Sequence, residues 1–218
     1  MSLLIKNGKI FAKGILINKN IFVEKGKIAK ITSQNLKAGK IINAKNKIVL
    51  PGLIDSHVHF REPGLTHKED FYTGSRAAVA GGITTILDMP NTLPATTDLQ
   101  RLGEKRKLAK KSIVNYGFHF GSTKDNIAEI EKVKNIASVK VYMDHTTGNL
   151  LITDKNALKK IFSMPITKTL HAESENIIKA LQLRKNNSNN SRMYFCHVSS
   201  KEELDYIIKN KKGNVFVE

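Results

Sequence analysis

The sequence is poor in the residues that mark secreted, membrane-spanning and base-stacking proteins. It has no tryptophan and a single cysteine, Cys196, so an internal disulfide is excluded. No stretch approaches the ~20 apolar residues that cross a bilayer. The first residues, MSLLIKNGKIFAKG, lack the uninterrupted apolar segment of a signal peptide. We therefore expect a cytoplasmic protein with no membrane partner.

Acidic residues are also scarce, since 19 aspartates and glutamates stand against 36 lysines and arginines, for a formal net charge of +17. Such a balance can signal a polyanionic partner, because clustered Lys and Arg neutralise phosphates. Here the lysines are spread over every segment, and few aromatic side chains are present to stack on bases. We therefore do not expect a nucleic-acid partner, whereas a small anionic substrate would suit the positive field.

Two patterns divide the chain near Leu50. Residues 1–49 form short apolar segments separated by turn signals such as Asn7-Gly8 and Lys25-Gly26, which predicts a small all-β unit. Residues 50–218 alternate short apolar runs with helix-like stretches, the pattern of parallel βα units. The expected strands span 48–55, 83–89, 113–120, 138–143, 167–172, 192–198 and 214–218. The expected helices span 68–80, 98–111, 125–136, 154–163, 174–185 and 200–211.

This α/β alternation fits a (β/α)8 barrel of the TIM type, although a doubly wound sheet follows the same local pattern. A complete barrel needs an eighth strand and usually ~250 residues, whereas the seventh expected strand coincides with the end of the chain. We therefore expect an incomplete barrel with about seven strands present. The polar stretch 184–192 is predicted to be a solvated loop.

Four histidines fall at the ends of expected barrel strands. His57 and His59 lie two residues apart just after the first barrel strand, so on an extended chain both imidazoles project to the same side. Such a pair can bind one divalent ion such as Zn²⁺ at the mouth of a barrel, although His-x-His also arises by chance. His171 and His197 end later strands. All four imidazoles should therefore converge on one rim.

Lys140 lies in the apolar run Ser-Val-Lys-Val-Tyr-Met of the fourth expected strand. An unpaired ammonium would be costly to bury there. One interpretation is that Lys140 serves the histidine site, and the other is that its long side chain reaches the solvent at the rim.

Several segments together resemble the amidohydrolase superfamily and, within it, the dihydroorotase family. The similarity covers PGLIDSHVHFREPG (51–64), DMPNT (88–92), KVYMDHTTGN (140–149), LHAE (170–173) and CHVSS (196–200), in the order of that family. Each motif is short, but their order and their places at strand ends make the resemblance specific.

The resemblance implies a binuclear zinc site. His57 and His59 would hold one ion, His171 and His197 the other, and Lys140 would bridge both as its carbamate. Asp144 is the alternative bridge. Arg61 and Asn91 would bind the ring carboxylate of the substrate, as a planar bidentate donor and an amide can. The alternative for Arg61 is an ion pair with Glu62 or Asp70.

The implied activity is the reversible hydrolysis of (S)-dihydroorotate to N-carbamoyl-L-aspartate in de novo pyrimidine synthesis. Hydantoinases and allantoinases, which share the metal set, are the enzymatic alternatives. The other alternative is a catalytically incomplete relative that acts as a partner of an enzyme such as aspartate transcarbamoylase, and a homodimer is also expected.

The resemblance also implies missing parts. The family's general acid/base, an aspartate after the eighth strand, would lie beyond Glu218, and so would a segment that completes residues 1–49 into a composite β-sandwich. We interpret the sequence as a fragment or as a shortened, inactive descendant. His145 is expected to face outward rather than to add a ligand, and His67 and His119 are expected to be structural.

Overall fold

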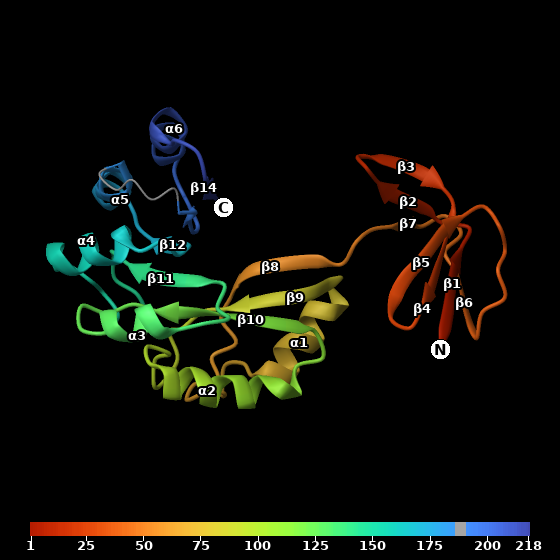
Figure 1. The fold of residues 1–218 in the computed structure, drawn as a ribbon, viewed down its shortest axis with the longest axis horizontal. Coiled ribbons are helices and arrows are strands. Elements are labelled where there is room, and N and C mark those ends of the chain that lie inside the picture. Colours follow the sequence, from red (N-terminus) through yellow and green to blue (C-terminus); the bar gives the residue numbers. More distant parts are fainter. Residues whose placement is uncertain (186–190) are drawn as a thin grey trace. The chain divides into compact units, whose positions relative to one another are not determined.

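A computed structural model describes residues 1–185 and 191–218 (Figure 1). The predicted loop 184–192 therefore falls mostly outside the described residues. The chain divides into two compact units, Met1–Gly52 and Leu53–Glu218, and the boundary expected after residue 49 lies three residues before the observed one. No described helix is long and apolar enough to span a bilayer.

The first unit consists of two separate small sheets, which confirms its all-β character. One sheet has the strand order β5 (Lys27–Thr32), β4 (Asn20–Glu24), β1 (Ser2–Lys6), β6 (Lys40–Asn43). The other has the order β3 (Ile15–Asn18), β2 (Lys9–Ala12), β7 (Ile48–Val49). The turn between β4 and β5 uses Lys25 and Gly26 at positive φ (51° and 74°), the geometry that joins two antiparallel strands tightly.

The second unit is a curled sheet of seven parallel strands in chain order, as Figure 1 shows for β8 to β11. The strands are β8 (Leu53–Val58), β9 (Ile83–Asp88), β10 (Asn115–Gly121), β11 (Ser138–Tyr142), β12 (Lys168–His171), β13 (Met193–Phe195) and β14 (Val215–Val217). A doubly wound sheet would reverse its strand order at a switch point, and this sheet does not. The predicted partial TIM-type barrel is confirmed.

Among residues 53–185 and 191–218, six α-helices connect these strands. They are α1 (Phe71–Ala80), α2 (Leu99–Leu108), α3 (Ile127–Lys132), α4 (Lys155–Ser163), α5 (Glu175–Lys185) and α6 (Lys201–Asn210). Polar side chains cap the first turns of α1 and α4: Asp70 accepts from Tyr72 N and Thr73 N, both at 2.8 Å, and Asp154 accepts from Ala157 N at 2.7 Å. These two helices therefore begin at a fixed residue after the strand that precedes them.

The expected strand 48–55 is wrong at its start. Ile48 and Val49 belong to β7 of the first unit, and β8 begins only at Leu53, beyond Pro51 and Gly52. Proline has no N–H to give to a sheet, so the pairing stops before it. β8 extends instead through Val58 and carries His57 within the strand.

The two faces of β11 serve different purposes. All five of its residues are buried. Val139 and Val141 belong to the apolar core between sheet and helices, whereas Lys140 and Tyr142 line a cavity on the opposite face. Because side chains alternate along a strand, this one strand anchors the core and also supplies polar groups to the inside of the barrel.

Candidate metal centre

The four histidines at the strand ends lie in one cluster. The ring centroids of His57 and His59 are 5.1 Å apart, those of His57 and His197 are 5.6 Å apart, and those of His171 and His197 are 4.6 Å apart. His57 comes from β8 and His171 from β12, which are distant in the sequence but share the carboxyl rim of the parallel sheet.

His57 and His59 turn their Nε2 atoms toward each other at 3.1 Å. Their outer nitrogens are engaged by acceptors: His59 Nδ1 lies 2.7 Å from Asn91 Oδ1, and His57 Nδ1 contacts the Glu218 carboxylate. Each Nδ1 therefore carries the proton, which leaves a lone pair on each Nε2. Two lone pairs that face each other repel unless a cation lies between them. The pair is thus a ready donor set for a divalent ion.

The second pair of histidines also brings two ring nitrogens close together. His171 Nδ1 lies 2.8 Å from His197 Nε2, while His171 Nε2 donates to the carbonyl oxygen of His145 at 3.0 Å. The proton of His171 is therefore on Nε2, and its Nδ1 presents a lone pair to His197. The clustered imidazole nitrogens of the residues present fit the donor set of a metal ion.

Burial favours the neutral forms of His59, His171 and His197, which metal binding requires. It lowers the pKa of His59 from 6.5 to about 4, with the hydrogen bond to Asn91 opposing the shift. The pKa values of His171 and His197 are also lowered, mainly by burial and then by the nearby charges of Lys140 and His171, respectively. All three side chains are therefore ready ligands near pH 7.

Lys140 lies beside the histidines with its side chain 1% exposed, so the interpretation that it reaches solvent is wrong. Its Nζ is 2.9 Å from Cys196 Sγ and 5.3 Å from the centroid of the Tyr142 ring. No carboxylate among the described residues forms an ion pair with it, and burial lowers its pKa. A neutral amine is the form that reacts with carbon dioxide.

Two other lysines are fully buried but are structural. Lys105 pairs with Asp88 at 2.6 Å, and Lys168 donates to the carbonyl oxygen of Phe162 at 3.1 Å at the end of α4. Sequence analysis singled out neither of them. Lys140 differs because its only hydrogen-bond partner among the described residues is a thiol.

Arg61 lies in the loop after β8 with φ at +62°, a conformation that costs energy for a non-glycine residue. Its Nη1 is buried and has no hydrogen-bond partner among the described residues. The alternative ion pair with Glu62 or Asp70 is wrong, because Lys111 binds both carboxylates, at 2.9 and 3.4 Å. The guanidinium is therefore held in place with a free donor.

A cavity of about 130 Å³ brings these residues together. It is lined by His57, His59, Arg61, Asn91, Lys140, Tyr142, Thr146, Thr147, His171 and His197. Asp144 is absent from this wall, since its carboxylate accepts from Glu173 N at 2.7 Å and from Asn176 Nδ2 at 2.8 Å, so the structure does not support it as the bridge. The His145 side chain is exposed, which agrees with an outward orientation.

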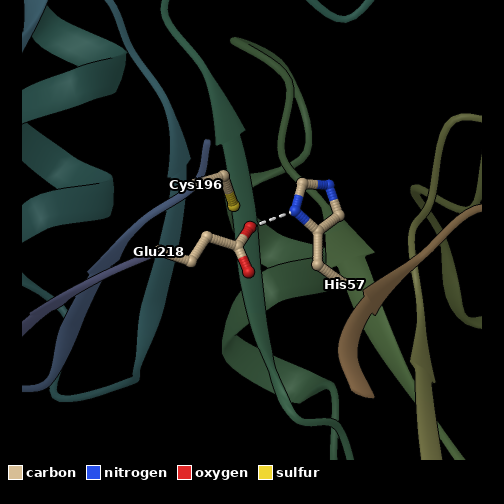
Figure 2. A group of neighbouring side chains, drawn as sticks. All are labelled: His57, Cys196 and Glu218. Carbon is tan, nitrogen blue, oxygen red and sulfur yellow. Dashed lines mark hydrogen bonds and ion pairs between the residues drawn. The ribbon is translucent and has the colours of Figure 1, made fainter. Parts of the chain in front are cut away.

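Sequence analysis missed a second group beside His57. Figure 2 shows His57, Cys196 and Glu218 pointing toward one another, and their ligand atoms lie within 4.8 Å of one another. Burial acts to raise the pKa of Glu218, but hydrogen bonds from His57 and Tyr194 hold that pKa below its usual range. Its position at the end of the seventh strand is the signal that would have pointed to this carboxylate.

Comparisons with known proteins agree on the family. Residues 48–201 match the model of the amidohydrolase family. A dihydroorotase of Methanosarcina acetivorans is 36% identical over 95% of this chain and 52% of its own length, and one of Methanosarcina mazei is 43% identical over 78% of this chain and 39% of its own length. Among solved structures, the L-hydantoinase of Arthrobacter aurescens matches with a TM-score of 0.88 and 25% identity. The match covers 99% of this chain and 57% of the hydantoinase chain. The chain thus spans about half the length of the relatives it matches.

Proposed function

This chain belongs to the amidohydrolase family, and we propose that it carries the metal and substrate-carboxylate site of a dihydroorotase. The reaction would be the reversible hydrolysis of the cyclic amide of (S)-dihydroorotate to N-carbamoyl-L-aspartate, a step of de novo pyrimidine synthesis. The observation that carries the substrate choice is Arg61, which lines the same cavity as the four histidines and whose buried Nη1 has no partner in the part of the chain that the structure describes. Similarity to two dihydroorotases supports it.

The chain would bind two zinc ions. His57 and His59 would hold one through their Nε2 atoms, and His171 Nδ1 with His197 Nε2 would hold the other, because these nitrogens already face each other in pairs. Such ions supply a water of lowered pKa and polarise the scissile carbonyl. Asn91 and Glu218 would fix the tautomers and ring orientations of His59 and His57 by accepting their Nδ1–H groups.

Lys140 would bridge the two histidine pairs as a carbamate. The unprotonated Nζ adds to the carbon of carbon dioxide, an N–C bond forms, and one proton leaves to solvent. The product is an anion with two oxygen ligands, which removes the cost of a buried amine without a carboxylate partner. Burial favours this reaction because it lowers the pKa of Lys140.

Arg61 and Asn91 would bind the ring carboxylate. A guanidinium donates to both oxygens of a carboxylate, which orients the ring as well as attracting it. Asn91 uses its Oδ1 for His59, so its amide NH2 is the group that would donate to the carboxylate. We assign the transfer of a proton to the leaving ring nitrogen to no residue of this chain.

A hydantoinase-like activity is the second candidate, because the fold superimposes on L-hydantoinase with a TM-score of 0.88. Hydantoin lacks the ring carboxylate, so the two candidates differ in what Arg61 would bind.

A homodimer, or a complex with aspartate transcarbamoylase, is a further proposal that size-exclusion chromatography with the purified partner would test.

The test is ring opening of dihydroorotate at mildly alkaline pH by the purified chain, supplied with zinc and bicarbonate, with metal content measured on the same samples. We expect zinc binding and dihydroorotate turnover, both lost in His57→Ala and retained in His67→Ala, whose histidine is exposed and outside the cavity. Turnover of hydantoin but not of dihydroorotate would favour the second candidate. An absence of bound zinc would refute the metal centre itself.

A further inference from the structure

A second buried hydrogen-bond donor in the cavity wall lacks a partner. The Tyr142 hydroxyl has no hydrogen-bond partner among the described residues, although the residue is 1% exposed. It shares this property with Arg61 Nη1, and both residues line the cavity that contains the histidine cluster. A buried hydroxyl without a partner is destabilising, so native structures rarely retain one without a reason.

The ring of Tyr142 is fixed in its orientation. Tyr142 and Lys140 are two residues apart on β11 and so project from the same face of the strand. The Lys140 Nζ lies 5.3 Å from the centroid of the Tyr142 ring, and the His171 ring lies 5.8 Å from it, centroid to centroid. Because Tyr142 is buried and lines the cavity, the cavity is the place from which a ligand can reach its hydroxyl.

The chemistry of Arg61 Nη1 and of the Tyr142 hydroxyl indicates which kind of ligand group would form hydrogen bonds with both. A guanidinium only donates and so needs an acceptor, whereas a phenol hydroxyl can donate or accept; an oxygen acceptor is therefore the partner that both groups can share. A carboxylate has two acceptor oxygens and the negative charge that a buried guanidinium requires. A neutral carbonyl would satisfy one donor and leave the charge of Arg61 unpaired.

We propose that Tyr142 is a specificity-determining residue that donates a hydrogen bond to one oxygen of the carboxylate whose other oxygen is bound by Arg61. This inference rests on the proposed function, because it needs a substrate that carries a carboxylate. It makes Tyr142 a binding residue that separates the carboxylated ring from the same ring without its carboxylate.

The test measures the affinity of two ligands by calorimetry on the zinc- and bicarbonate-loaded chain. Dihydroorotate carries the carboxylate, and dihydrouracil is the same ring without it. Tyr142→Phe should weaken dihydroorotate binding by about 10- to 100-fold, the size of a lost hydrogen bond to a charged group. Dihydrouracil binding should change by less than about 2-fold, since that ring has nothing for the hydroxyl to bind. Tyr116→Phe, a partly exposed tyrosine outside the cavity, is the matched control and should change neither.

Two further readouts separate binding from structure. Tyr142→Phe should keep its zinc content and should not lower the melting temperature, because phenylalanine removes a hydroxyl that has no partner in the free protein. A lower melting temperature, or equal weakening of both ligands, would show a structural role and overturn the inference. Loss of zinc or of the Lys140 carbamate would show that the hydroxyl serves the bridge, which also overturns it.

The two proposals fail in different ways. If the parent chain binds dihydroorotate and Tyr142→Phe binds it equally well, only the role of Tyr142 is refuted. If the parent chain binds zinc but not dihydroorotate, the dihydroorotase proposal is refuted, and the role of Tyr142 with it.

Discussion

Breaking the buried ion pair between α2 and β9 should destabilise the chain and disturb the metal centre. Lys105 Nζ lies 2.6 Å from Asp88 Oδ2 and donates to the carbonyl oxygen of Met89 at 2.6 Å, and both side chains of the pair are 0% exposed. Asp88 Oδ1 also accepts from Phe60 N at 2.7 Å. Through these hydrogen bonds to Phe60 and Met89, the pair holds the backbone segments that carry His59 and Asn91 next to each other.

Lys105→Met keeps the length and packing of the side chain but leaves Asp88 alone. Burial already raises the pKa of Asp88, and Lys105 is the charge that opposes this shift. Removing one partner of a buried pair costs about 3–5 kcal/mol. For a domain of this size, a loss of that magnitude lowers the melting temperature by about 6–20 °C.

The assay is urea unfolding followed by circular dichroism, with zinc affinity measured on the same variants. Lys107→Met, an exposed lysine on the same helix, is the control and should change stability by less than about 0.5 kcal/mol. Lys105→Met combined with Asp88→Asn should recover part of the loss, because no charge then remains buried. A loss of less than about 1 kcal/mol in Lys105→Met, or no recovery in the double variant, would refute the reasoning.

Three other predictions follow from the same geometry. Zinc at 100 times its dissociation constant should stabilise the chain by about 2.7 kcal/mol for each bound ion, or roughly 5–10 °C in a thermal melt, and His59→Ala should abolish the stabilisation that one ion provides. Burial lowers the pKa of His119 from 6.5 to about 4, so the unfolded chain takes up a proton that the folded chain refuses. Stability should therefore be intact above pH 6.5 and fall toward pH 4, and His119→Gln should reduce that slope by up to about 1.4 kcal/mol per pH unit in urea titrations. Gly64→Ala should lower the free energy of unfolding by about 2 kcal/mol or more and weaken dihydroorotate binding, because φ is +85° and the new Cβ would lie 1.9 Å from the carbonyl oxygen of Leu93. Gly82→Ala is the control: its φ is +82° but the space around the new Cβ is open, so the loss in urea unfolding should be smaller.

The barrel was predictable from the sequence because its signals are local and repeated. Apolar runs of strand length, separated by helix-like stretches with Asp or Ser at their starts, place most strands and helices within a few residues of the observed ones. The start of the first barrel strand was missed because Ile48 and Val49 look like its beginning, whereas they pair with β2. A pairing partner distant in the sequence leaves no local signal.

The cavity residues were predictable to different degrees. His57, His59, His171 and His197 follow or end strands, and parallel strands bring their carboxyl ends to one rim, so their position near one another follows from order alone. Tyr142 and Glu218 also stand at strand ends, but a tyrosine in an apolar run reads as core. Only its unpaired hydroxyl distinguishes it.

The sequence by itself determined the family, the order of strands and helices, and which imidazoles share a rim, because each depends on residue type and spacing along the chain. The tertiary structure alone decided which nitrogen of each histidine is free, which lysines are buried with a partner, and which donors are left unpaired in the cavity. Those properties depend on the direction of side chains from elements far apart in the sequence. Hydrogen bonds such as His59 to Asn91 exist only once β8 and the loop after β9 lie side by side.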